Sequence, residues 1–184
     1  MSDFATPPDL SDALDLVRDV ADFPKPGVTF KDISPLLAEP TALGRVVEAL
    51  AAAGRGPDGA AAVDTVVGME SRGFIFGAPV ALALGVGFVP VRKPGKLPGE
   101  TRSVSYDLEY GSETLEILVD ALAPGERVLL VDDVLATGGT ARATADLVEQ
   151  AGASVHALAV LLELSFLPGR ATLGDVPLTA LRTV

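Results

Sequence analysis

The stretch VLLVDDVLATGGT, residues 128–140, places four apolar residues before two adjacent aspartates and ends in Thr-Gly-Gly-Thr. The apolar run predicts a buried strand, and the glycines predict a tight turn into a following helix. Two neighbouring carboxylates at the end of such a strand repel each other and lose hydration. The stretch therefore predicts an α/β fold in which a group from outside the chain compensates these charges.

Helices and strands alternate on either side of this stretch. Apolar residues at helical spacing predict helices over residues 10–21, 43–50, 73–84 and 139–151. Short apolar runs predict strands over residues 65–68, 86–91, 128–131 and 155–162, with a last strand near Leu178. This order predicts a central, mostly parallel sheet flanked by helices, in a single domain over residues 1–184.

The ends of the predicted parallel strands are where a ligand is expected. Ligands on such sheets bind at the carboxyl ends of the strands, so residues 70–73 and 132–140 are the loops of interest. The only histidine, His156, falls inside an apolar strand. We therefore expect His156 in the core rather than in catalysis.

Three segments need separate treatment. Residues 23–37, FPKPGVTFKDISPLL, hold too much proline for a helix and predict an extended, ordered segment. Residues 103–119 alternate apolar and polar side chains around a Tyr-Gly-Ser turn, which predicts an antiparallel β-hairpin. The uncharged run 74–91 approaches the length of a membrane helix, but prolines and glycines interrupt it. We expect a buried helix and a strand there, and no membrane span.

The composition narrows the function classes. The chain has 14 basic and 25 acidic residues and a net charge of −11, which disfavours binding to a nucleic-acid backbone. It has no cysteine, which excludes disulfides, cysteine nucleophiles and thiolate metal sites and fits a reducing compartment. Residues 1–9 are acidic and contain two prolines, so we expect no targeting segment and a cytoplasmic location.

The glycine turn predicts an anion site. Gly138 and Gly139 carry no side chains, so backbone N–H groups can converge on one point at the positive end of the following helix. Thr137 and Thr140 add hydroxyl donors. The paired aspartates lie one loop length away, where they can accept hydrogen bonds from sugar hydroxyls or hold Mg²⁺ through water. A phosphate and a diol at that separation describe a ribose 5-phosphate.

Other interpretations of this loop are weaker. The glycines could form a structural turn while the aspartates cap the helix, but the combined pattern favours a ligand. A nucleotide triphosphatase needs Gly-Lys-Ser/Thr, whereas Gly95-Lys96 is followed by Leu97. The segment around Ser71 has the serine one residue out of register for a hydrolase elbow.

Residues 128–140 resemble the phosphoribosyl diphosphate motif of the type I phosphoribosyltransferases. Four more stretches resemble the adenine phosphoribosyltransferase branch of that family. They are FPKPGVTFKDISPLL at 23–37, GMESRGFIFG at 68–77, VRKPGKLPGET at 91–101 and SYDLEYG at 105–111. Together these matches are in the family order and span most of residues 20–165.

The resemblance implies the type I phosphoribosyltransferase fold, with a small hood at about residues 20–37 and a flexible β-hairpin lid at about 92–118. It implies transfer of phosphoribosyl from 5-phospho-α-D-ribose 1-diphosphate (phosphoribosyl diphosphate) to adenine, giving AMP and diphosphate in purine salvage. Mg²⁺ would be the cofactor, held by substrate and water near Asp132 and Asp133 without direct protein ligands. The partners would be these substrates and products and a second copy of the chain in a homodimer.

The resemblance also assigns residues to roles. Those implied for phosphoribosyl diphosphate are Asp132, Asp133, Ala136, Thr137, Gly138, Gly139, Thr140, Glu70, Ser71, Arg72, Lys93 and Lys96. Those implied for adenine are Val28, Thr29, Phe30, Arg72 and Val134. A strained or cis peptide bond between Glu70 and Ser71 is typical of such family loops.

Residues 92–102 form a basic segment with a net charge of +3, because the segment contains four basic residues, Arg92, Lys93, Lys96 and Arg102, and one acidic residue, Glu100. Its prolines and glycines exclude a regular helix or strand and predict a mobile lid that attracts a polyanion. The alternative is a solvated basic loop. The resemblance makes Arg92 catalytic and lets the basic residues reach a neighbouring subunit's diphosphate.

Glu109 follows an alternating strand. A carboxyl group among aromatic and apolar neighbours can have a raised pKa and share a proton with a purine nitrogen. An exposed glutamate without function is the alternative. The resemblance implies that Glu109 is the catalytic acid or base and that Tyr110 covers the site.

Two further functions stay open at this stage. A related transferase could use xanthine or orotate, although residues 23–32 have the adenine-type form. A regulator could sense phosphoribosyl diphosphate without turnover, although residues 1–25 offer only Arg18 and Lys25 as basic residues.

Overall fold

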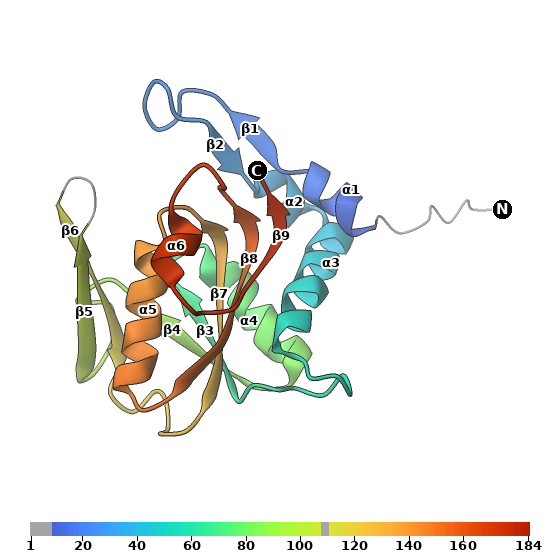
Figure 1. Ribbon diagram of the computed structural model, residues 1–184. Helices are drawn as coiled ribbons and strands as arrows, with labels where there is room; N and C mark the ends of the chain where they lie inside the picture. Colours follow the sequence, from blue (N-terminus) through green and yellow to red (C-terminus); the bar gives the residue numbers. More distant parts are fainter. Residues whose placement is uncertain (1–8, 108–110) are drawn as a thin grey trace. The chain divides into compact units, whose positions relative to one another are not determined.

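The computed structural model describes residues 9–107 and 111–184 (Figure 1). The chain divides into two compact units, one ending at Ala49 and the other spanning Leu50–Val184. Helices and strands alternate, and the α/β class that the sequence predicts is confirmed.

The first unit is built from short elements. They are α1 (Leu10–Asp15), β1 (Arg18–Val20), β2 (Phe30–Asp32), α2 (Ser34–Ala38) and most of α3 (Pro40–Ala51). A capping box between Asp9 and Asp12 starts α1. Strands β1 and β2 pair antiparallel. The predicted helix at 43–50 is confirmed as part of α3.

Two predictions for this unit are wrong in part. The helix predicted over residues 10–21 ends at Asp15, because the next residues form β1 instead. There Arg18 stands opposite Asp32 and Asp19 opposite Lys31, so each cross-strand pair joins opposite charges.

The proline-rich segment is also not extended throughout. Residues Ser34–Ala38 form α2. Its proline lies in the first turn, where the missing N–H has no partner to lose. The Asp32 carboxylate accepts a hydrogen bond from the Ser34 N–H at 2.9 Å, which fixes the start of this helix.

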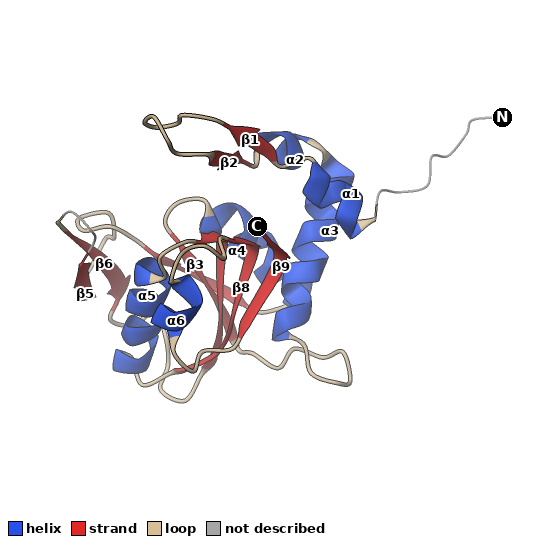
Figure 2. Cartoon of the chain, turned by 45° about the horizontal axis from the view of Figure 1, so that its top comes forward, coloured by secondary structure: helices blue, strands red, loops and turns tan. Residues whose placement is uncertain are grey.

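The second unit contains a five-stranded sheet in the order β4-β3-β7-β8-β9, and every neighbouring pair is parallel. Its strands are β3 (Thr65–Met69), β4 (Gly87–Val91), β7 (Arg127–Leu135), β8 (Ser154–Glu163) and β9 (Leu178–Thr183). Figure 2 shows α4 (Gly73–Leu84) on one face of this sheet and α5 (Gly139–Gln150) with α6 (Gly169–Leu173) on the other. The predicted parallel sheet flanked by helices is confirmed.

A short 3₁₀ helix, η1 (Ala52–Gly54), begins this unit. The predicted hairpin is confirmed as β5 (Thr101–Asp107) and β6 (Ser112–Leu118), which pair antiparallel. It lies beside α5 in both ribbon views (Figures 1 and 2).

Strand β7 runs through the middle of the sheet, with β3 on one side and β8 on the other. Its residues 128–131 are fully buried, which explains the unbroken apolar run. The strand continues four residues past the predicted end at Val131, so the two aspartates lie within it rather than after it. Asp132 stands opposite Val160 of β8.

The structure corrects one further expectation. His156 is only partly buried near the start of β8, where the strand has not yet entered the core. Leu158, two residues on, is fully buried. Within residues 9–107 and 111–184, no helix reaches the length and hydropathy that crossing a membrane requires.

Candidate active site

The strand order creates a crevice between β3 and β7. Strand β4, which follows β3 in the chain, pairs with the edge of β3 that faces away from β7. Strand β8, which follows β7, pairs with the edge of β7 that faces away from β3. The helices that follow these strands, α4 and α5, lie on opposite faces of the sheet (Figure 2). The loops after β3 and β7 therefore diverge, which is the position where open parallel sheets bind ligands.

The two aspartates lie at this switch point. The Asp133 side chain is 5% exposed, and its Oδ2 lies 2.9 Å from the Arg72 Nε. Within the described part of the chain, this buried oxygen receives no well-directed hydrogen bond, so the contact is an ion pair alone. Asp132 Oδ1 accepts a hydrogen bond from the Asp133 N–H at 2.9 Å.

Both aspartates are held where ionisation is unfavourable. Burial, followed by repulsion from Asp133, raises the pKa of Asp132 well above its ordinary value. Burial also raises the pKa of Asp133, although the Arg72 guanidinium opposes that rise. Carboxylates in this state are stabilised by incoming hydroxyl donors or a cation, so the pair has the chemistry of a binding site.

Gly73 keeps the space beside Asp132 open. A Cβ at this first residue of α4 would lie 2.7 Å from the Val131 carbonyl oxygen and 3.0 Å from Asp132 Oδ1. Helix α4 therefore approaches β7 more closely than any other residue type would allow.

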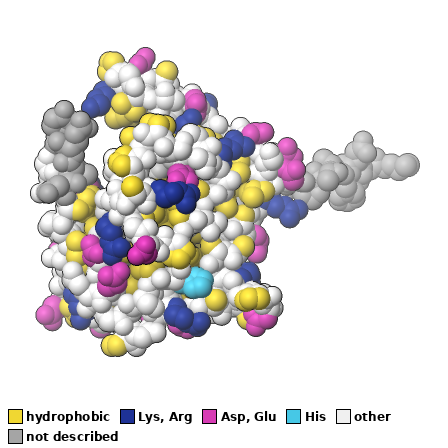
Figure 3. Space-filling view, viewed as in Figure 1, with side chains coloured by type: hydrophobic (Ala, Val, Ile, Leu, Met, Phe, Trp, Pro, Cys, Tyr) yellow, Lys and Arg dark blue, Asp and Glu magenta, His cyan; other side chains and the backbone are white. Residues whose placement is uncertain are grey.

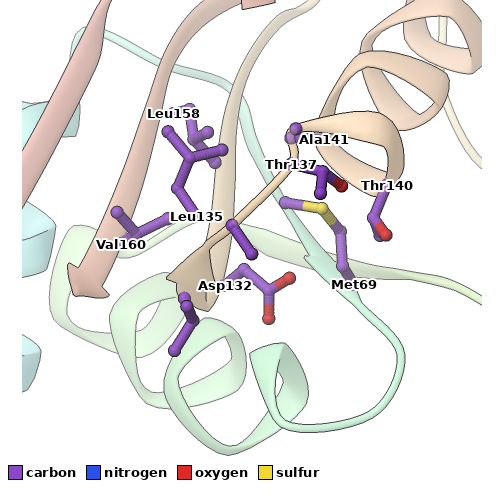
Figure 4. Close-up of a pocket in the computed structure, with 11 residues that line it drawn as sticks. Met69, Asp132, Leu135, Thr137, Thr140, Ala141, Leu158 and Val160 are labelled. Atoms are coloured by element: carbon purple, nitrogen blue, oxygen red, sulfur yellow. The ribbon is translucent and has the colours of Figure 1, made fainter. Parts of the chain in front are cut away.

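The loop after β7, residues 136–140, is called the phosphate loop below. It surrounds a cavity of about 80 Å³ together with Asp132, Val134 and Met69 (Figure 4). Figure 4 shows the Asp132 carboxylate and the side chains of Thr137 and Thr140 around this space. The structure thus brings Asp132 and four of the predicted phosphate-binding residues, Ala136, Thr137, Gly138 and Thr140, to one cavity, while Asp133 and Gly139 are not among its lining residues.

Helix α5 begins with its backbone donors available. Gly138 precedes the helix with a φ of 86°, a left-handed conformation that suits glycine. No side chain caps α5, and its first turn has no acidic residue. Within the described residues, the first N–H groups of this helix thus receive no side-chain cap, which suits a bound anion.

Tyr106 of β5 contacts the same loop, and the sequence reasoning missed it. A Cβ on Gly139 would lie 2.7 Å from the Tyr106 ring, so the ring lies directly on the glycine. The Tyr106 hydroxyl lies 2.9 Å from Thr140 Oγ1 and donates to Glu113 Oε2 at 3.1 Å. Alternation placed Tyr106 in a hairpin strand, but no local pattern shows that this hairpin packs on α5.

The basic segment converges on Glu70. Lys96 Nζ lies 2.5 Å from Glu70 Oε1, the Lys93 N–H donates to Oε2 at 2.8 Å, and Arg92 Nε lies 3.4 Å from Oε2. Burial favours a raised pKa for Glu70, but these positive groups outweigh it and leave the pKa lowered. Arg102 instead donates to the Val119 carbonyl, away from this cluster. The peptide bond between Glu70 and the exposed Ser71 is cis.

Lys93 links the basic segment to the hairpin. Its ammonium lies 2.8 Å from Glu113 Oε1, and Glu113 in turn holds Tyr106. Lys93, Glu113, Tyr106 and Thr140 therefore form a continuous chain of contacts from the basic segment to the phosphate loop. On α5, Arg142 pairs with Asp146 and Glu149. Figure 3 shows basic side chains lying next to acidic ones on the face that it presents.

The remaining predicted residues lie in separate parts of the chain. Val28, Thr29 and Phe30 belong to the first unit, where the Phe30 ring meets the Phe23 ring edge-on at 5.1 Å. These two rings line an apolar cavity of about 190 Å³ with Val20 and Asp32. The predicted adenine residues Arg72 and Val134 belong to the second unit. Glu109 and Tyr110 lie outside the described residues.

The chain matches one protein family, described as the phosphoribosyl transferase domain, over residues 37–166. An adenine phosphoribosyltransferase of Nocardioides sp. is 72% identical over 177 residues, which are 96% of each chain. The adenine phosphoribosyltransferase of Streptomyces coelicolor is 58% identical over 176 residues, covering 93% of this chain and 94% of that one.

Solved structures of adenine phosphoribosyltransferases are also similar to this chain. Adenine phosphoribosyltransferase from Thermoanaerobacter pseudethanolicus superposes with a TM-score of 0.89 at 48% identity, covering 95% of this chain and 99% of that one. The Saccharomyces cerevisiae enzyme, solved in complex with an imino-altritol bisphosphate and adenine, gives a TM-score of 0.86 at 42% identity. That match covers 92% of this chain and 98% of the yeast chain.

Proposed function

Because the chain belongs to the phosphoribosyl transferase domain family, in its adenine phosphoribosyltransferase branch, we infer that it transfers phosphoribosyl from phosphoribosyl diphosphate to adenine. The products are AMP and diphosphate, so the protein is a pentosyl-transferring enzyme of purine salvage. One observation in its own structure supports this function best: Asp132 lines one small cavity together with Thr137, Gly138 and Thr140 at the uncapped start of α5.

We propose one orientation for the donor at this cavity. The 5-phosphate lies among the N–H groups of the phosphate loop, with Thr137 and Thr140 adding hydroxyls. The ribose hydroxyls donate hydrogen bonds to Asp132 and Asp133. These hydrogen bonds offset part of the unfavourable interaction between the two carboxylates. Diphosphate then points toward the loop after β3, where Glu70, Ser71 and Arg72 lie.

The basic residues at 92–96 can exchange their present carboxylate partners for the diphosphate of the donor. In this structure Glu70 pairs with the side chains of Arg92 and Lys96, and Glu113 pairs with the Lys93 ammonium. Diphosphate carries more negative charge than one carboxylate. We propose that these basic residues transfer to diphosphate as it leaves C1 of the ribose. This neutralises the leaving group, while closure of residues 92–118 as a lid excludes water from the cationic ribosyl centre.

The oxygen atoms of Asp132 and Asp133 fit a hydrated Mg²⁺ as well as ribose hydroxyls. The buried Asp133 Oδ2 has no directed hydrogen bond within the described residues, and hard cations prefer such oxygens. These two residues would hold Mg²⁺ through water, and the bound ion would neutralise charge on the diphosphate.

We propose that the first unit supplies the base site as a hood within one phosphoribosyltransferase domain. The edge-on Phe23 and Phe30 rings and their apolar cavity suit a flat heterocycle, with Val28 and Thr29 beside them. The family resemblance also assigns Arg72 and Val134, which belong to the second unit, to adenine. Glu109 would exchange a proton with the purine, and Tyr110 would cover it.

We also propose a homodimer in the cytoplasm. Helix α4 has exposed apolar side chains on its outer face, with Ile75 at 42% and Leu82 at 82% exposure, seven residues apart and so on one side of the helix. A second copy of the chain would cover this face. The absence of cysteine fits a reducing compartment.

The function is tested by measuring nucleotide formation from phosphoribosyl diphosphate and Mg²⁺ with adenine, hypoxanthine, guanine, xanthine or orotate. We expect AMP from adenine and little product from the other bases. Product from xanthine or orotate without product from adenine would instead indicate a related transferase. Tight donor binding without product from any base would indicate a sensor of phosphoribosyl diphosphate.

A further inference from the structure

The segment after β8 lies directly against the phosphate loop. The Leu164 N–H donates to the carbonyl of Leu135, the residue that precedes this loop, at 2.9 Å. A Cβ on Gly169 would collide with the Ala136 carbonyl oxygen. A Cβ on Gly138 would lie 2.7 Å from the Gly169 carbonyl oxygen and 2.8 Å from the Thr172 Cβ. Helix α6 therefore forms one wall behind the loop.

One ion pair holds α6 in this place. Arg170 Nε donates to Glu163 Oε1 at 2.8 Å, and Arg170 Nη2 donates to Oε2 at 2.7 Å. Such a two-point contact between guanidinium and carboxylate fixes direction as well as distance. Thr183 Oγ1 of β9 lies 3.4 Å from the same carboxylate. Glu163 ends β8 and stands opposite Leu135, so the pair is anchored one residue from the phosphate loop.

Helix α6 is short, and besides this ion pair it is held by the buried Leu173 and by its packing against the phosphate loop. It spans only Gly169–Leu173, a length at which a helix is not stable by itself in water. Within this helix, Gly169 and Leu173 are the buried residues. The Arg170 side chain is 62% exposed, whereas the Glu163 side chain is 8% exposed. The pair of Glu163 and Arg170 therefore adds a directed, charged contact to the packing that positions α6.

We propose that Arg170 and Glu163 are positioning residues that brace the phosphate loop from behind and thereby set its affinity for the 5-phosphate of the donor. The proposal rests on the proposed function of that loop. The match to the general phosphoribosyl transferase domain ends at Phe166, so α6 lies beyond the part that the family as a whole shares. The brace acts through the loop backbone and does not touch the reacting atoms.

The test compares two ion pairs that involve opposite ends of the central sheet. Arg170→Met removes the brace, and Arg127→Met removes a similar two-point pair, between Arg127 and Asp64 at the amino end of β7. For each variant, KM is measured separately for phosphoribosyl diphosphate and for adenine. Ribose 5-phosphate binding is measured by titration calorimetry, which needs no turnover.

We expect Arg170→Met to raise KM for phosphoribosyl diphosphate and to weaken ribose 5-phosphate about tenfold to hundredfold, as misplacement of a binding group by about 1 Å can do. KM for adenine should stay within about twofold, and Arg170→Lys should be intermediate because it restores the charge with one contact. Arg127→Met should leave all three values unchanged. Equal donor KM and equal ribose 5-phosphate affinity in both variants would overturn the proposal.

Loss of Arg170 leaves the Glu163 carboxylate buried without its partner, which can unfold the chain. The double variant Arg170→Met with Glu163→Gln removes this charge and should show the same loss of ribose 5-phosphate binding. A folded double variant with normal ribose 5-phosphate affinity would contradict the brace. If the unaltered protein binds ribose 5-phosphate but makes no AMP, the proposed function fails while the brace is still decided by the binding data.

Discussion

Aspartates are found in opposite electrostatic states near the two ends of β7: Asp64, which precedes β3, pairs with the first residue of β7, whereas Asp132 and Asp133 lie in β7 itself. At the amino end, Asp64 binds Arg127 through two contacts of 2.9 and 3.1 Å near the surface. Hydrogen bonds from the Arg127 side chain and backbone lower the pKa of Asp64 to about 2. At the carboxyl end, burial raises the pKa of both Asp132 and Asp133.

The direction of the carboxyl pKa shift distinguishes Asp64, which stabilises the fold, from Asp132 and Asp133, which we propose bind a ligand. A lowered carboxyl pKa means that ionisation favours the folded state, so pairing of Asp64 contributes stability at neutral pH. A raised carboxyl pKa has the opposite sign: stability falls as the pH rises from the ordinary carboxyl pKa toward the raised one. The carboxyl end of β7 is therefore arranged for binding at the expense of stability.

The largest effect is expected from replacing both carboxylates, Asp132→Asn with Asp133→Asn. The ribose hydroxyls lose charged acceptors, so kcat/KM for phosphoribosyl diphosphate should fall at least about a hundredfold. The melting temperature at pH 7 should hold or rise, by about 2–4 °C per kcal/mol gained, because the repulsion is gone. Steady-state kinetics and calorimetric melting check both. Unchanged turnover in the folded variant would remove these aspartates from the site.

A smaller loss is expected when a methyl group is added at the phosphate loop by Gly139→Ala. Its Cβ would lie 2.7 Å from the Tyr106 ring, so the hairpin or the loop must move. We expect kcat/KM to fall about tenfold to hundredfold. The control is Gly44→Ala on α3, where a Cβ meets nothing within 4 Å, and it should be neutral or stabilising. Equal kinetics in the two variants would show that the close approach has no role.

The next effect tests the contact between hairpin and loop. Tyr106→Phe keeps the ring on Gly139 but removes the hydroxyl that meets Thr140 and Glu113. Loss of about 1 kcal/mol of hydrogen bonding corresponds to about a fivefold fall in kcat/KM for the donor. Ser105→Ala is the control, because it breaks an exposed 2.8 Å contact with Thr114 in the same hairpin. An identical result from both would make Tyr106 a packing residue only.

The smallest effect on activity is expected at the amino end of β7, from Asp64→Asn. Turnover should be unchanged at every pH where the protein is folded. The variant should be less stable than the parent in urea at pH 7, and this difference should shrink as the pH falls below the ordinary carboxyl pKa of about 4 toward 2. If the difference in stability between the parent and Asp64→Asn instead grew as the pH fell, the stabilising pair of Asp64 and Arg127 would be contradicted.

Much of the second unit could be predicted from the sequence because its signals are local. The helix predicted over 73–84 coincides with α4, and Gly85 ends it in a left-handed conformation with a φ of 71°. Residues 132–140 likewise hold their aspartates, glycines and threonines within nine positions. Local spacing was therefore enough to propose these residues as the donor site.

What could not be predicted depends on contacts between distant segments. Tyr106 reaches Thr140 across 34 residues, and Gly169 meets Ala136 across α5 and β8. The false helix at 16–21 has a related cause, since cross-strand charge pairing with residues 30–32 overrides apolar spacing that fits a helix. Local patterns contain no information about such partners.

The central claim is that the carboxyl end of β7 binds the phosphoribosyl group. A crystal structure with AMP bound tests it most directly. The account predicts the phosphate among the N–H groups of residues 137–140, and the ribose hydroxyls within hydrogen-bond distance of Asp132 and Asp133. AMP bound with its phosphate elsewhere, or with its ribose turned away from both aspartates, would contradict the account.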